Sequence, residues 1–278
     1  MIATVPTVNP TVNPRLPVHR RALAAEETAT HTRILRLALG MHESRAYWAQ
    51  VDPATPSPTR ALLAFQQRWF GAKSLERVRL LLANFTARYD ALPQALDVLR
   101  RWRDMDAHTR QVICHVHLQI SDPIYRRFTG QFLVARRAQP HMSLTRDVVL
   151  RWFAAEYTDR WGAATRIQFA SKLLSAASEA GLISLRKDPR QFLTPHVPNL
   201  ALAYVLHLLR GLDFQGTLLD NPYLASLALT GPSLDARVRV LPGVQVARMG
   251  ELVDVRWAAP DLSAWADQYL RQEQREDD

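Results

Sequence analysis

The sequence predicts a mostly α-helical protein with winged helix-turn-helix elements and a small antiparallel β meander near the C-terminus. Three observations predict this fold class. Apolar residues recur at helical spacing over most of the 278-residue chain. Hydrophobic residues are 47% and charged residues 22% of the chain, the range of globular proteins. Period-two alternation of apolar and polar residues begins only past Gly231.

The chain divides into three predicted parts. Residues 1–18 contain VPTVNPTVNPRLPV, whose four prolines exclude a helix interior and predict a flexible arm. Residues 19–140 are predicted as an N-terminal helical domain with a helix-turn-helix-like element. Residues 141–278 are predicted as a C-terminal domain that carries the winged helix-turn-helix and the meander.

Helical periodicity, interrupted by glycine and proline breaks, places the helices in order. The predicted helices span residues 22–40, 42–50, 60–70, 74–92, 94–102, 109–120, 123–137, 144–161, 165–178, 200–209 and 260–272. Three strands, RVRVLPG, VQVARMG and ELVDVRW, follow one another across residues 237–257. Their predicted inner face is made of valines: Val238, Val240, Val244, Val246, Val253 and Val255.

Basic residues concentrate in the centre of the chain. The formal net charge is +9, and residues 60–172 hold 19 basic and 9 acidic side chains. Residues 211–278 hold 6 basic and 11 acidic ones, so the C-terminal part is acidic. This asymmetry favours a polyanionic partner for the centre. A general arginine bias is the alternative, because 32 of the 35 basic residues are Arg.

The segment from Gly162 to Arg190 resembles the second half of a winged helix-turn-helix. On a helix of about 100° per residue, apolar residues fall on one side, among them Ile167, Phe169, Leu173 and Leu174. The other side carries Thr165, Gln168, Ser171, Lys172 and Ser175, with Arg166 in the first turn, and its one acid, Glu179, lies at the C-terminal end. Such small, amide and cationic side chains donate to phosphates and base edges. The alternative is an ordinary packing helix.

The residues that follow this helix predict a wing. Gly181 supplies a left-handed cap, residues 182–185 read as a short strand, and the RKDPR tip carries Arg186, Lys187 and Arg190. In a winged helix-turn-helix the second helix enters the major groove and the wing lies on the backbone. The predicted first helix is Leu144 to Trp161, with Gly162, Ala163 and Ala164 as the turn.

A second candidate helix covers residues 73–88. Its polar side aligns Lys73, Arg77, Asn84 and Arg88, a length that suits the tracking of a groove. A solvated face is the alternative interpretation.

Motifs for catalysis and metal binding are not found. The sequence has neither GxxxxGK[ST] nor GxGxxG. The one thiol–histidine cluster, Cys114, His115 and His117, supplies at most two zinc ligands and has no third orienting group, so a buried thiol with partly exposed histidines is predicted. We therefore expect no enzyme, no cofactor and no metal.

Three segments together resemble the BrxA family of BREX phage-defence systems. They are FGAKSLERVRLLLANFTARYDAL, CHVHLQISDPIYRRFTGQFLVARR and TRIQFASKLLSAASEAGLIS. The resemblance, from about Ala61 to the late strands, implies a cytosolic, non-catalytic, helical DNA-binding protein encoded beside a methyltransferase, an ATPase and other defence components. It carries a DNA-facing role onto Lys73, Arg77, Arg166, Gln168 and Lys172.

Three functional hypotheses follow from the sequence. The first is an accessory protein that binds double-stranded DNA mainly through Arg and Lys contacts to phosphates. The others are a protein–protein scaffold of the defence complex and a transcriptional regulator that reads one operator. The longest apolar run, Leu200 to Leu209, is too short to span a bilayer, so we expect a cytoplasmic protein without membrane contact.

Overall fold

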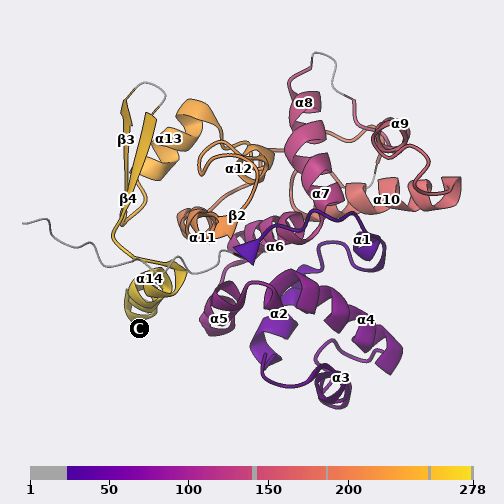
Figure 1. The fold of residues 1–278 in the computed structure, drawn as a ribbon, viewed down its shortest axis with the longest axis horizontal. Coiled ribbons are helices and arrows are strands. Elements are labelled where there is room, and N and C mark those ends of the chain that lie inside the picture. Colours follow the sequence, from indigo (N-terminus) through magenta and orange to yellow (C-terminus); the bar gives the residue numbers. More distant parts are fainter. Residues whose placement is uncertain (1–23, 140–142, 186, 250–251, 277–278) are drawn as a thin grey trace, which may run out of the picture.

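The computed structural model describes residues 24–139, 143–185, 187–249 and 252–276, and it confirms the mostly helical fold class. Helical lobes surround a central helix (Figure 1). The predicted arm at residues 1–18 lies outside the described residues, and the predicted domain boundary at residue 140 stays a prediction. In the described part of the chain, no helix is long and apolar enough to cross a membrane.

The central helix is α6 (Ala107–Ser121), buried on nearly every side from Val112 to Ser121. Its N-terminus is capped by Asp106, whose carboxylate accepts from the backbone N–H groups of His108 and Thr109. Helices from both halves of the chain pack against it, so even its polar residues His115, His117 and Gln119 are buried.

The N-terminal half forms the lower lobe in Figure 1. Its helices are α1 (Arg33–Arg36), α2 (Met41–Gln50), α3 (Ser57–Gln66), α4 (Leu75–Phe85) and α5 (Pro93–Arg101). A π-helical segment, Thr86–Asp90, extends α4. Arg60 Nη1 pairs with Asp90 Oδ2 at 2.6 Å and thereby ties α3 to this segment.

The middle of the chain forms the lobe at the upper right of Figure 1. A continuous helix runs through α7 (Pro123–Arg127), a π-helical segment (Phe128–Phe132) and α8 (Leu133–Arg137). Asp122 caps it, as its side chain accepts from Tyr125 N. Two further helices, α9 (Arg146–Glu156) and α10 (Ala163–Glu179), pack against each other through stacked Phe153 and Phe169 rings.

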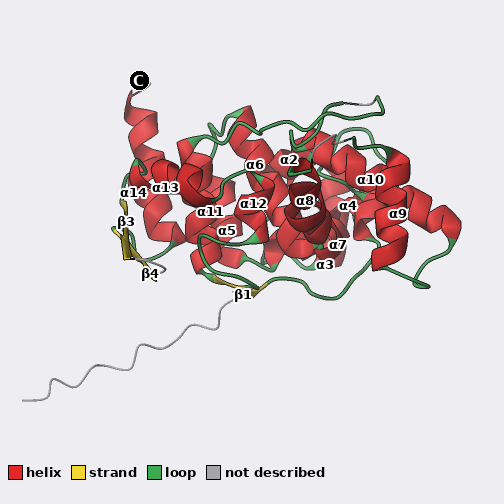
Figure 2. Cartoon of the chain, turned by 90° about the horizontal axis from the view of Figure 1, so that it is seen from above, coloured by secondary structure: helices red, strands yellow, loops and turns green. Residues whose placement is uncertain are grey.

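The C-terminal part forms the remaining lobe. It contains α11 (Asn199–Arg210), β2 (Leu212–Asp213), α12 (Pro222–Ser226), α13 (Gly231–Arg239), β3 (Val244–Met249), β4 (Leu252–Trp257) and α14 (Leu262–Glu276). Strands β3 and β4 pair antiparallel, while β2 pairs in parallel with β1 (Ala24–Ala25) from the start of the described chain. Seen from above, the β3–β4 hairpin and the α9–α10 unit lie at opposite ends of the molecule (Figure 2).

The prediction of a three-stranded meander is wrong in its first strand. Residues 231–239 form helix α13, with Pro232 in its first turn. Leu234, Val238 and Leu241 are buried at helical spacing, whereas Val240 is 64% exposed. Four residues such as RVRV are too few to distinguish the period of a strand from that of a helix. The burial of residues at helical spacing against the core favours the helix.

Candidate nucleic-acid interface

The α9–α10 unit has the element order and pairing of a winged helix-turn-helix. Leu144, just before α9, forms an antiparallel bridge with Arg190. Ile183, just after α10, forms another with Phe192. Gly181 ends α10 with a φ of +73°, as its sequence position predicted. Isolated bridge residues thus stand where a winged helix-turn-helix has its strands, in the order bridge, helix, turn, helix, bridge, wing and bridge.

The turn between the two helices is longer than predicted. Helix α9 ends at Glu156 instead of Trp161, and Asp159 adopts a φ of +57° in the connection. Tyr157 turns inward and is only 8% exposed, packing against Phe153 and Trp161. Gly162 is the N-cap of α10, so Ala163 and Ala164 belong to the helix rather than to the turn.

The outer face of α10 is exposed and carries polar side chains. Gln168, Lys172 and Ser175 are exposed, whereas Thr165 and Ser171 are half-buried. The opposite side is fully buried, with Phe169 and Leu173 at 0% exposure. Ile167 departs from the prediction because it is 45% exposed instead of buried in the apolar side. It lies at the edge of the apolar stripe, where helical periodicity does not decide burial.

Arg166 holds the turn that precedes α10. Its Nε donates to the carbonyl oxygen of Trp161 at 2.6 Å, and its side chain is half-buried. This bond engages Nε only, so the phosphate contact of Arg166 stays a prediction.

The wing is anchored to α10 by Arg190. Its Nη1 donates to Ser178 Oγ at 2.7 Å, and the side chain is only 14% exposed. Its Nε and Nη1 groups are engaged within the protein, so the structure gives Arg190 an anchoring role in the wing, and its DNA contact stays a prediction. Lys187 is exposed on the same wing, and Leu185 beside it is 72% exposed. Arg186 lies outside the described residues.

On α4 the structure separates the four aligned residues into two pairs. Arg77 is exposed and Lys73 half-exposed at the start of the helix, which Ser74 caps by accepting from Arg77 N. Asn84 is buried and its Nδ2 donates to Leu80 O at 2.8 Å.

Arg88 is also buried, with 3% exposure, so the predicted DNA contacts of Asn84 and Arg88 are wrong. Arg88 Nη1 donates to Leu39 O at 2.7 Å and Nη2 to Ala38 O at 2.9 Å. The segment after α1 covers this side of α4, a long-range contact that the periodicity of one helix does not contain.

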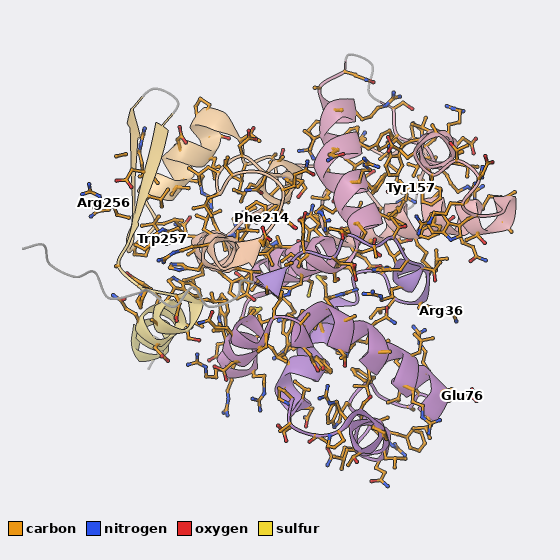
Figure 3. All side chains as sticks on the ribbon, viewed as in Figure 1. Arg36, Glu76, Tyr157, Phe214, Arg256 and Trp257 are labelled. Carbon is orange, nitrogen blue, oxygen red and sulfur yellow. The ribbon has the colours of Figure 1, made fainter. Side chains whose placement is uncertain are left out.

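Helix α1 connects the two candidate helices. It packs against both α4 and α10. Arg77 Nη1 donates to the carbonyl oxygen of Arg36, at the end of α1, at 3.1 Å. Arg36 itself is exposed, and Figure 3 shows it at the same end of the molecule as Glu76 of α4, far from Arg256 on β4. Sequence reasoning missed Arg36, because only the folded chain brings residues 36, 77 and α10 together.

The Cys114–His115–His117 cluster lies in the core. All three side chains are fully buried, which corrects the expectation of partly exposed histidines. Burial lowers the pKa of each histidine to about 3, so both are neutral. His115 contacts Tyr125 and Ser226, and His117 contacts Tyr204 at 2.7 Å. Within the described ranges, no group of three or more His, Cys, Asp or Glu side chains is placed to hold a metal ion.

Comparisons with known proteins support the fold alone. No protein-family model matches the chain, and no curated protein matches it. The structure is similar to the crystal structure of an uncharacterized protein from Magnetospirillum magneticum, with a TM-score of 0.51 and 15% sequence identity. The similarity covers 66% of this chain and 98% of that one.

Proposed function

We propose that this protein binds double-stranded DNA without catalysing a reaction, with α10 in the major groove and the wing on the adjacent backbone. The observation that carries the proposal is the outer face of α10. This face is exposed and polar, it has no acid before Glu179, and it lies between the wing and α1. Helices in this position of a winged helix-turn-helix present their N-terminal half to base edges.

Cations on three elements support phosphate contacts around that face. Lys172 is exposed on α10, Lys187 on the wing, and Arg36 on α1. Arg77 adds a fourth positive charge beside Arg36, while Glu76 is the neighbouring acid. Positive charges spread over a groove-sized surface attract a duplex irrespective of its sequence.

The resemblance to the BrxA family supports a biological setting for this activity. In that setting the protein is a cytoplasmic accessory component of a BREX-type phage-defence system, and other defence subunits are its protein partners. The scaffold and regulator hypotheses predict different DNA-binding results. A scaffold does not bind DNA, and a regulator protects one operator.

Charge reversal tests the proposed surface. Fluorescence anisotropy with a duplex of mixed sequence compares the wild type with Lys172→Glu and with the control Arg256→Glu on the distant hairpin. Lys172→Glu is expected to weaken binding about tenfold at low salt, since it removes one phosphate contact and adds a repulsive charge. Arg256→Glu is expected to bind like the wild type. Equal affinity of both variants and the wild type would contradict the assignment of this face.

A further inference from the structure

Ile167 is an exposed aliphatic side chain in the half of α10 that would meet the bases. It is 45% exposed, and it lies on the wing side of the helix, in line with Ser171, Leu174 and Ser178. The wing reaches this side, because Arg190 donates to Ser178 and to the Leu174 carbonyl. Core packing therefore does not account for the choice of isoleucine at this position.

Gln168 stands next to Ile167, about 100° around the helix. It is exposed, and the structure gives its amide no hydrogen-bond partner among the described residues. A glutamine amide matches the N6 donor and N7 acceptor of adenine in the major groove. An aliphatic side chain matches the 5-methyl group of thymine.

We propose that α10 prefers A·T base pairs, with Gln168 on adenine N6 and N7 and Ile167 on the thymine 5-methyl group. This inference rests on the proposed DNA binding and adds a sequence preference to it. Ala163 and Ala164, exposed in the first turn, leave room for the bases to approach the helix closely.

The surroundings of Ile167 favour a nucleic acid over a protein partner. A contiguous exposed apolar patch of several hundred Å² would mark a protein interface on this helix. Ile167 instead has half-buried Ser171 and exposed Ala164 next to it on the helix surface. Lys172 and Lys187 flank the same face, and this charge is complementary to phosphates.

Base analogues test each contact by removing single atoms or groups. The probe is a short A·T-rich duplex in three versions: unmodified, with uracil for thymine, and with 7-deazaadenine for adenine. For the wild type, loss of the methyl group is expected to weaken binding about fourfold, the effect of one buried methyl group. Loss of adenine N7 is expected to weaken it about fivefold, half of a bidentate contact.

Two variants assign the contacts. Ile167→Ala is expected to bind the thymine and uracil duplexes equally while it keeps the response to 7-deazaadenine. Gln168→Ala is expected to bind the adenine and 7-deazaadenine duplexes equally while it keeps the preference for thymine over uracil. Both positions are exposed, so circular dichroism should report a wild-type fold.

The outcomes separate this inference from the proposed function. Wild-type protein that binds all three duplexes equally, with a salt-dependent affinity, would overturn the A·T preference and leave DNA binding in place. Persistence of the methyl effect in Ile167→Ala would overturn the assignment of that residue. Absence of binding to every duplex at low salt would overturn both proposals.

Discussion

The guanidinium of Arg190 donates to Ser178 Oγ at 2.7 Å and so joins the wing to the last turn of α10. The same wing is held a second time two residues earlier, where Asp188 Oδ2 accepts from the backbone N–H of Arg146 at 2.8 Å. A basic residue in the wing thus fixes its position, while Lys187 stays exposed to contact phosphates.

Substitution of Arg190 tests whether this anchor orders the wing. Arg190→Ala is expected to raise amide hydrogen exchange across residues 183–192, because loss of the Ser178 contact removes about 1–2 kcal/mol. DNA affinity should fall severalfold through loss of order. Lys187→Ala is the matched control, which should leave exchange unchanged and reduce the salt slope of binding by about one. If Arg190→Ala changed only the salt slope, the anchor role would be wrong.

Arg88 is predicted to act in folding and not in DNA binding. Arg88→Met keeps most of the side-chain volume but leaves the carbonyls of Ala38 and Leu39 without their donor. The free energy of unfolding, measured with urea, should fall by about 2–4 kcal/mol. Arg79→Met, at an exposed position of α4, should change it by less than about 0.5 kcal/mol. A loss of DNA affinity without a loss of stability would contradict the burial of Arg88.

The buried His115 and His117 predict a loss of stability in acid. Their pKa is about 3 in the fold and about 6.5 in the unfolded chain, so below pH 6.5 the unfolded chain binds protons that the fold does not. Each histidine therefore lowers the free energy of unfolding by up to about 1.4 kcal/mol per pH unit as the pH falls towards 3.

His117→Gln removes one of these titrating groups. Between pH 4 and 6 it should therefore reduce the slope of the unfolding free energy against pH by up to about 1.4 kcal/mol per pH unit. Tyr204→Phe removes the hydrogen-bond partner of His117 without removing the titrating group, so it should keep the wild-type slope. An unchanged slope in His117→Gln would show that the buried ring does not stay neutral.

Arg36 is predicted to contribute to the same DNA-binding surface as Lys172, although the two lie far apart in sequence. Arg36→Glu should weaken duplex binding by about the same factor as Lys172→Glu, because α1, which carries the exposed Arg36, packs against α10. Fluorescence anisotropy against the Arg256→Glu control measures the effect. Wild-type affinity of Arg36→Glu would place the duplex away from α1.

Much of the fold follows from local sequence signals. Asp122 caps a helix, Pro123 stands in the first turn of that helix, and Gly181 ends α10, all at positions that the sequence indicates. These signals act within a few residues, so they require no knowledge of tertiary contacts.

The candidate site was less predictable, because which of its side chains are exposed depends on the segments that pack over each helix. Periodicity assigned Arg88 to the same face as Arg77, yet residues 38 and 39 cover only the C-terminal end of α4. Periodicity also placed Ile167 in the apolar stripe, and it gave no sign that Arg36 belongs to a helix packed against α10. A contact between distant segments buries Arg88, none covers Ile167, and the packing of α1 places Arg36; the periodicity of one helix contains none of this information.

A salt titration of wild-type protein with a fluorescent duplex of random sequence tests the central claim most directly. The account predicts submicromolar binding at low salt, with log K falling against log salt at a slope of about −3 to −4, as for about four phosphate contacts. No binding even at low salt would contradict it. Helix α10 would then be a packing helix with a polar face, and protein partners would become the hypothesis to test.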